Sequence, residues 1–245
     1  MSDAAIHTAT RAQIQEALDQ VANLETFTGR LAGLSEHFLG APYLAFTLIG
    51  GPDEDEQLVT RLDGFDCVTF VESVLALAWS RVPEDFPRNL RAIRYHAGRC
   101  TWLDRNHYMS RWIARNTEAH LVEPLLEDEA TDTGEIRQLS SLPGYPAQDW
   151  PVRYVPSTAL PSLAQRARPG DVVCFMSNKP VLDTFHVGLL IPGPVLAVRH
   201  ASRSRAQVVH QDLDDFLERN DVPGMLLARP SPHALRSRDA TLEAP

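Results

Sequence analysis

The sequence LDGFDCVTFVESVLALAW, Leu62 to Trp79, joins a turn to the most regular helical pattern of the chain. From residue 67 onward, apolar residues recur at the three- and four-residue spacing of one helical face, which predicts a helix over 67–79. The turn places Cys67 in the first turn of that helix. A helix N-terminus offers free N–H groups and partial positive charge, both of which favour a thiolate. Cys67 is therefore a candidate nucleophile, and its ordinary alternative is a buried structural cysteine.

Two strand-like runs in the second half of the chain each carry a histidine. TFHVGLLI (184–191) and VLAVRH (195–200) flank a short turn centred on Gly193, which is the pattern of a β-hairpin. With that centre, His186 lies directly opposite His200, and their Cβ atoms would be about 4.5–5.5 Å apart on one face.

A cysteine, a histidine and a third polar group form the triad of a thiol hydrolase. One imidazole takes the thiol proton, and the third residue fixes the orientation of that imidazole. Cys67, His186 and His200 supply these three groups. Gly188 lies two residues beyond His186 on the same face, so it keeps bulk away from the site.

Helices precede strands along the chain, which predicts an α+β fold in which the nucleophile helix packs on an antiparallel sheet. Residues 127–151 are polar and rich in turn formers, so we expect a long connection with at most one strand pair. We expect one domain over 1–230, with a helical N-terminal segment, and a flexible tail over 231–245. The remaining predicted helices are 11–25, 87–95, 110–116 and 212–220, and the remaining predicted strands are 171–176 and 207–209.

Composition excludes several classes of protein. The 23 Lys and Arg residues against 32 Asp and Glu residues give a net charge of −9, which argues against nucleic acid as a partner. The three cysteines include no C-x-x-C pair, so neither a disulfide framework nor a zinc knuckle is expected. No apolar run approaches the ~18 residues of a membrane span. The first residues lack the features of a secretory signal, so we expect a cytoplasmic location unless a leader was removed or a dedicated secretion system exports the chain.

The order of motifs resembles the bacterial N-acetylmuramoyl-L-alanine amidase-like family, a branch of the NlpC-type papain-like cysteine hydrolases. The resemblance covers most of the chain and implies a papain-like α+β fold. The matching motifs are GAPY (40–43), LDGFDCVTFVE (62–72), RY (94–95), RNHY (105–108), PGD (169–171), FHVG (185–188), RHAS (199–202) and ARP (228–230).

The resemblance also implies roles for individual residues. It makes Cys67 the nucleophile, His186 the general base and His200 the orienting residue. Asp66 has a helix N-cap as its ordinary alternative, and the RNHY segment has a polar loop. We further expect Arg105 to bind a peptide carboxylate, because a guanidinium can hold one bidentately. The residues matched to the substrate groove are Tyr43, Asp66, Arg105, Asn106, His107, Tyr108 and Ser202.

The implied reaction is cleavage of the N-acetylmuramoyl–L-alanine bond of cell-wall muropeptides, with a preference for 1,6-anhydro sugar ends. No cofactor or metal is expected, and a muropeptide is the expected partner. Three alternatives stay open. They are a D-γ-glutamyl–diamino acid endopeptidase of the same superfamily, a non-catalytic glycan- or peptide-binding module, and a zinc hydrolase with Cys67, His186 and His200 as ligands.

Overall fold

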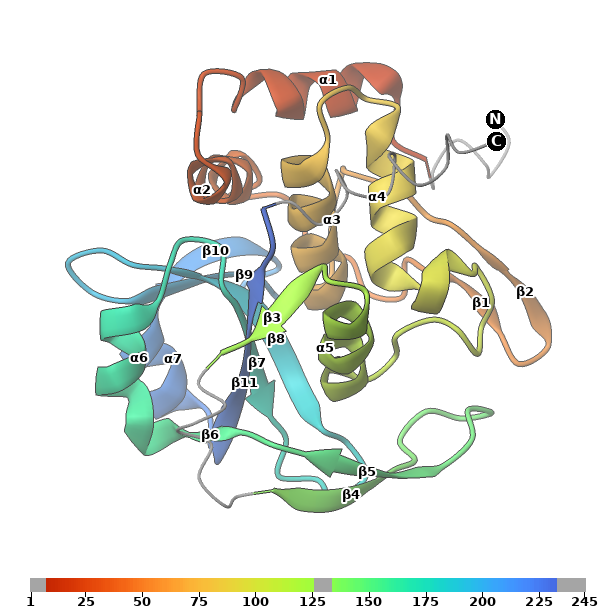
Figure 1. Ribbon diagram of the computed structural model, residues 1–245, viewed down its shortest axis with the longest axis vertical. Coiled ribbons are helices and arrows are strands. Elements are labelled where there is room, and N and C mark those ends of the chain that lie inside the picture. Colours follow the sequence, from red (N-terminus) through yellow and green to blue (C-terminus); the bar gives the residue numbers. More distant parts are fainter. Residues whose placement is uncertain (1–7, 126–133, 233–245) are drawn as a thin grey trace.

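A computed structural model describes residues 8–125 and 134–232 of the chain (Figure 1). Within them helices come first and most strands follow, so the predicted α+β class with an antiparallel sheet is confirmed. Most of the predicted tail, residues 233–245, lies outside the described residues. The helices of the first half are α1 (Arg11–Asp19), α2 (Phe27–His37), α3 (Cys67–Trp79), α4 (Asp85–Arg94) and α5 (Met109–Glu118).

The central sheet is antiparallel and has the strand order β10-β9-β8-β7-β11-β3, with β6 also paired to β11. Two hairpins, β1–β2 and β4–β5, stand apart from it, and the second is the strand pair predicted within 127–151. The strands of the central sheet are β3 (Val122–Pro124), β6 (Val155–Pro156), β7 (Val172–Met176), β8 (Thr184–Ile191), β9 (Ala197–Ser202), β10 (Gln207–Asp212) and β11 (Gly224–Pro230). The hairpin strands are β1 (Ile49–Gly51), β2 (Glu54–Gln57), β4 (Glu135–Leu139) and β5 (Gln148–Val152).

Helices cover both sides of the sheet. In Figure 1, α3, α4 and α5 lie along one side, whereas α6 (Leu160–Arg166) and α7 (Leu213–Arg219) lie on the other. Val187 and Leu189 of β8 belong to the core that α3 enters, and Leu190 belongs to the core that Phe216 of α7 enters. Short 3-10 turns at 96–98 and 157–159 complete the described secondary structure. No helix among the described residues is both long and apolar enough to cross a bilayer.

The sequence analysis did not predict α2, α6, β1, β2, β3, β6 and β11. Helix α2 was missed because FTGRLAGLSEH contains two glycines, which weaken a helical pattern. A Cβ at Gly33 would lie 2.9 Å from side-chain atoms of Val21 and Leu24, so the glycine is what lets α2 approach the end of the first helix. Strand β11 was also missed, and it is inserted between β7 and β3, far from both in sequence.

Helix α3 has the bounds that the apolar pattern predicts, and ten of its thirteen residues are buried. A buried ion pair ties it to its neighbours. Glu72 Oε2 accepts from Arg94 Nε at 2.7 Å, and the two side chains are only 2% and 3% exposed. Arg94 Nη1 also donates to the Val59 carbonyl at 2.7 Å, and Trp112 Nε1 donates to Glu72 Oε1 at 3.2 Å. These bonds join α3 to α4, α5 and the segment that leads into Cys67.

We predict that replacing one partner of this pair destabilises the chain strongly. Glu72→Ala or Arg94→Ala leaves the other charge buried and unpaired, which typically costs about 3–5 kcal/mol. The double variant Glu72→Leu/Arg94→Met should lose less, because no lone charge stays in the core. Urea unfolding followed by tryptophan fluorescence measures these differences. A loss below about 1 kcal/mol for both single variants, as for a surface pair, would contradict the prediction.

Candidate active site

Cys67 is the first residue of α3, and Asp66 is its N-cap. Thr69 N donates to Asp66 Oδ1 at 2.8 Å, and Asp66 N donates to Thr69 Oγ1 at 2.9 Å, which together form a capping box. The helix-cap alternative for Asp66 is therefore present in the structure. This reciprocal pair sets where the helix begins, and so it fixes the position of the thiol.

The thiol of Cys67 is partly accessible, yet protein surrounds it closely enough that burial raises its pKa to about 12. The Asp66 carboxylate adds to the rise, and N–H groups of Val187, Val68 and Cys67 itself oppose it. The sequence-based expectation of a ready thiolate is therefore wrong for the free site, because desolvation and Asp66 outweigh the helix terminus. The Val187 N–H near Sγ places the thiol beside the β8 backbone that carries His186.

The hairpin register differs from the predicted one. Leu189 lies opposite Arg199 and Ile191 opposite Ala197, so the ladder continues with Gly188, not His186, opposite His200. The turn centre is Pro194 instead of Gly193, because β9 begins only at residue 197. A shift of two residues keeps both histidines on one face, since side chains alternate with period two.

The two histidines therefore meet diagonally. His186 Nε2 lies 2.7 Å from His200 Nδ1, with the ring planes at 90°. Phe216 of α7 packs against both rings, at centroid distances of 5.6 and 5.4 Å. A Cβ at Gly188 would lie 2.5 Å from Val198 Cγ2 and 3.1 Å from His200 Cβ, so only glycine permits this approach.

A fourth residue, which the sequence analysis missed, sets the protonation of the pair. The nearest partner of His200 Nε2 is Gln211 Oε1 on β10, at 3.3 Å, and an amide oxygen only accepts. His200 Nε2 therefore carries the proton, its Nδ1 accepts from His186 Nε2, and the Nδ1 of His186 keeps a free lone pair. The signal in the sequence was a polar residue two positions after Val209, which pairs with His200.

Burial keeps both imidazoles neutral. It lowers the pKa of His186 to about 3, with the neighbouring His200 as the second cause. It lowers the pKa of His200 to about 4, where Arg205 adds to the fall and the bond to Gln211 opposes it. Burial thus favours the neutral form of both the His186 imidazole and the Cys67 thiol.

Tyr43 and Ser202 join this group. Tyr43 pairs with Phe65 on one side and donates its N–H to the Ala206 carbonyl at 2.9 Å on the other. Burial raises the pKa of its phenol, Cys67 and Asp66 raise it further, and Arg203 opposes them. Ser202 is buried at the end of β9, with its Oγ 3.2 Å from Ser204 Oγ.

The RNHY segment lies elsewhere and makes structural contacts. Arg105 Nη1 donates to buried Glu56 at 2.9 Å, and its guanidinium stacks 4.6 Å from the Trp102 ring centroid. The other three residues bind neighbouring backbone or side chains: Asn106 Nδ2 donates to the Ile93 carbonyl, His107 Nε2 meets the Trp102 carbonyl, and the Tyr108 hydroxyl accepts from Leu142 N. The structure does not bring these four residues to the cavity that His186 and His200 line.

That cavity has a volume of about 630 Å³, within the usual range for small-molecule sites. Within residues 8–125 and 134–232, no Asp or Glu lines it. The residues around it are Phe185, His186, His200, Ser202, Arg203, Ser204, Arg205, Gln211, Phe216, Arg219 and Asn220.

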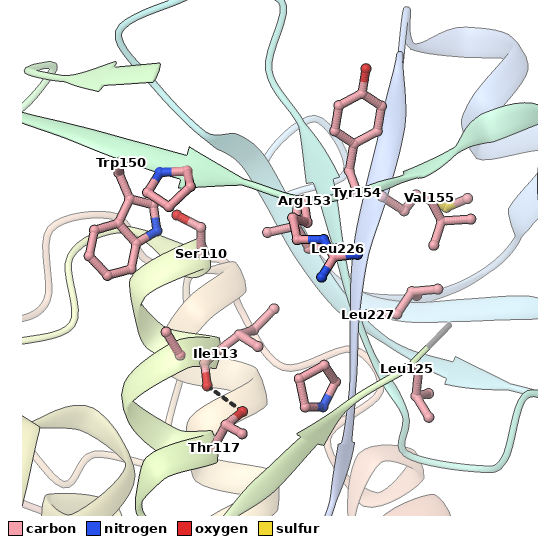
Figure 2. Close-up of a pocket in the computed structure, with 14 residues that line it drawn as sticks. Ser110, Ile113, Thr117, Leu125, Trp150, Arg153, Tyr154, Val155, Leu226 and Leu227 are labelled. Atoms are coloured by element: carbon pink, nitrogen blue, oxygen red, sulfur yellow. Dashed lines mark hydrogen bonds between the residues drawn. The ribbon is translucent and has the colours of Figure 1, made fainter. Parts of the chain in front are cut away.

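A second cavity of about 330 Å³ lies between α5 and strands β6 and β11 (Figure 2). Its wall is mostly apolar and includes Ile113, Trp150 and Leu227. None of the candidate site residues lines it. Of the candidate site residues, His186, His200 and Ser202 line the first cavity, whereas Cys67, Tyr43 and Asp66 do not.

We predict that the histidine pair makes stability depend on pH. The pKa of His200 is lowered in the folded state, so its stabilising contribution is complete above an unfolded pKa near 6.5 and is lost as pH falls toward 4. His200→Gln removes this titration. Between about pH 7.5 and about pH 5, the wild type should lose roughly 2 kcal/mol more than the variant. Urea unfolding at the two pH values measures it, and parallel losses would contradict the burial of a neutral imidazole.

The profile of the family described as "AmiA-like: N-acetylmuramoyl-L-alanine amidase-like" matches residues 33–225. No curated protein matches the chain.

Solved structures agree with this match. A structure described as an N-acetylmuramoyl-L-alanine amidase from Bacteroides uniformis ATCC 8492 is 26% identical with a TM-score of 0.72, covering 84% of this chain and 99% of that one. Protein LPG0564 from Legionella pneumophila str. Philadelphia 1 is 22% identical with a TM-score of 0.77, covering 94% and 97%, and at that identity it supports the fold alone. A Bacteroides fragilis structure described as a candidate xylanase is 27% identical with a TM-score of 0.65, covering 80% and 98%. The profile match spans most of the chain, which therefore belongs to the N-acetylmuramoyl-L-alanine amidase-like family and is an amidase-like hydrolase.

Proposed function

We propose that the chain is a cysteine amidase that cleaves the N-acetylmuramoyl–L-alanine bond of muropeptides with 1,6-anhydro sugar ends. The observation that carries this proposal is the 2.7 Å contact between His186 Nε2 and His200 Nδ1, on strands next to the start of the Cys67 helix. This contact supplies a base with a free lone pair and an orienting group, and the Val187 N–H places the Cys67 thiol beside the strand that carries His186. Family membership supports the bond, and the resemblance supports the anhydro end.

The reaction begins with proton transfer. His186 Nδ1 takes the thiol proton as Sγ of Cys67 attacks the lactyl carbonyl carbon, and His200 accepts the hydrogen bond from the imidazolium that forms. Because the pKa of the thiol is raised and that of His186 lowered, the resting pair is uncharged. Charge separation therefore develops only as substrate reacts.

The start of α3 suits the charge that develops on the substrate. The Cys67 N–H is one of the free donors of the first turn, so it can bind the oxyanion of the tetrahedral intermediate. Collapse of the intermediate breaks the C–N bond, and His186 gives its proton to the leaving amine of L-alanine. Water then hydrolyses the thioester, with His186 again as base.

The contact between the two histidines also distinguishes the proposed amidase from a zinc hydrolase. In a zinc site the imidazole nitrogens would face one metal, whereas Nε2 of His186 and Nδ1 of His200 face each other. The endopeptidase alternative uses the same triad, so only the bond that is cut distinguishes it.

Product analysis tests the proposal. Incubation with a purified anhydro-muropeptide mixture should release peptide that begins at L-alanine together with free anhydro sugar, as read by mass spectrometry. Cys67→Ala should abolish release, because no thioester can form. Cys100→Ala is the matched control and should keep most activity, since the Cys100 thiol contacts the Glu56 carbonyl and the Tyr95 side chain and does not line the cavity beside the histidines. Products that keep sugar joined to L-Ala-D-Glu would replace the amidase with the endopeptidase.

We also predict that Gln211 acts as a positioning residue through His200. Gln211→Leu removes the acceptor, and it should lower kcat by roughly 5- to 10-fold, the worth of one hydrogen bond. NMR of nitrogen-labelled imidazoles should show a mixed His200 tautomer in this variant. Gln211→Glu keeps an acceptor, so it should preserve the tautomer and raise the pKa of His200. Loss of activity in Gln211→Leu with an unchanged tautomer would assign Gln211 a packing role instead.

A further inference from the structure

The cavity beside the histidines is unusually cationic for this acidic chain. Arg203 and Arg205 lie in the turn between β9 and β10, and Arg219 ends α7. All three line the cavity and are exposed. Among the described residues, none of the three forms an ion pair with a carboxylate.

Several other arginines of the fold meet carboxylates of the protein itself. These pairs are Arg94–Glu72, Arg105–Glu56, Arg137–Glu135, Arg199–Glu36 and Arg229–Asp171. The chain has an excess of nine acidic groups, so partners are abundant. Three unpaired guanidinium groups around one cavity therefore indicate a partner that the protein does not supply.

Two of the arginines act electrostatically on candidate site residues. Arg205 is one cause of the lowered pKa of His200, after burial, and Arg203 opposes the rise in the pKa of Tyr43. Both arginines thus line the cavity close enough for their charges to act on His200 and Tyr43.

The chemistry of amide cleavage says which half of the substrate enters this cavity. The imidazole that takes the thiol proton must deliver a proton to the leaving nitrogen, so the leaving group lies on the imidazole side of the thiol. In the proposed reaction that group is the peptide, which carries free carboxylates. The lactyl carboxyl of the sugar is consumed in the amide bond.

We propose that this cavity binds a carboxylate of the leaving peptide, with Arg203, Arg205 and Arg219 as its cations. A guanidinium matches a carboxylate bidentately, and no acidic side chain from the described part of the chain lines the wall and competes for it. The inference rests on the proposed amidase function. It gives the role expected of Arg105, which Glu56 engages, to arginines that the sequence analysis did not single out.

The test compares two compounds: 1,6-anhydro-N-acetylmuramoyl-L-Ala-D-Glu and the same compound with both peptide carboxyls amidated. The wild type should favour the free acid in kcat/KM by about 10- to 100-fold, the range of charged hydrogen bonds. In Arg203→Ala/Arg205→Ala the preference should vanish, mainly through KM and with an unchanged Tm. Arg91→Ala, at an exposed arginine of α4, is the matched control and should keep the preference.

Each outcome has a distinct meaning. Equal rates of the wild type on both compounds, or a preference that survives in the double variant, would overturn the carboxylate site and leave the amidase intact. Cleavage of neither compound would overturn the proposed function. In that case calorimetry with the dipeptide L-Ala-D-Glu tests the cavity alone. Binding that the double variant loses supports the site, and absence of binding to the wild type overturns it.

Discussion

The buried contact between Glu72 and Arg94 is the constraint on which the site depends. It lies in the middle of α3 and is satisfied from three directions, by α4, by Trp112 of α5 and by the Val59 carbonyl. Two charges taken out of water are stable only when their hydrogen bonds are complete, so these elements have one acceptable arrangement. The arrangement fixes the axis of α3, and the Asp66–Thr69 capping box fixes where the helix starts. The position of Cys67 is therefore set by the start of α3 itself.

Sheet pairing and aromatic packing position the histidines. Strands β8, β9 and β10 lie side by side in the sheet. Because Gly188 has no side chain, His200 can lie close to the β8 backbone. Aromatic rings from Phe175 and Phe216 pack against His186, which desolvates it and keeps it neutral. The chain His186–His200–Gln211 runs across three strands, so the orientation of the base is set by the sheet itself.

The cavity beside the histidines differs in charge from the chain as a whole. Among the described residues, the charged side chains on the cavity wall beside the histidines are arginines, and the rest of the lining consists of histidine, phenylalanine, amide and hydroxyl side chains. In the proposed function, this cationic wall suits an anionic substrate whose reacting amide is itself uncharged. Water and salt screen the rest of the surface charge over roughly 8–10 Å, so the local wall matters more than the net charge.

The sequence by itself determined the α+β class, the bounds of α3, the helix-first order and the placement of His186 and His200 on one face of neighbouring strands. These follow from local periodicity and from residue types whose chemistry is independent of distant contacts. Only the tertiary structure decided the hairpin register, the membership of Gln211, the internal use of Arg105 and the free state of Arg203 and Arg205. Each of these depends on which residues meet across long stretches of chain. A register is set by where a turn ends, and an arginine is available to a ligand only if no carboxylate of the fold reaches it first.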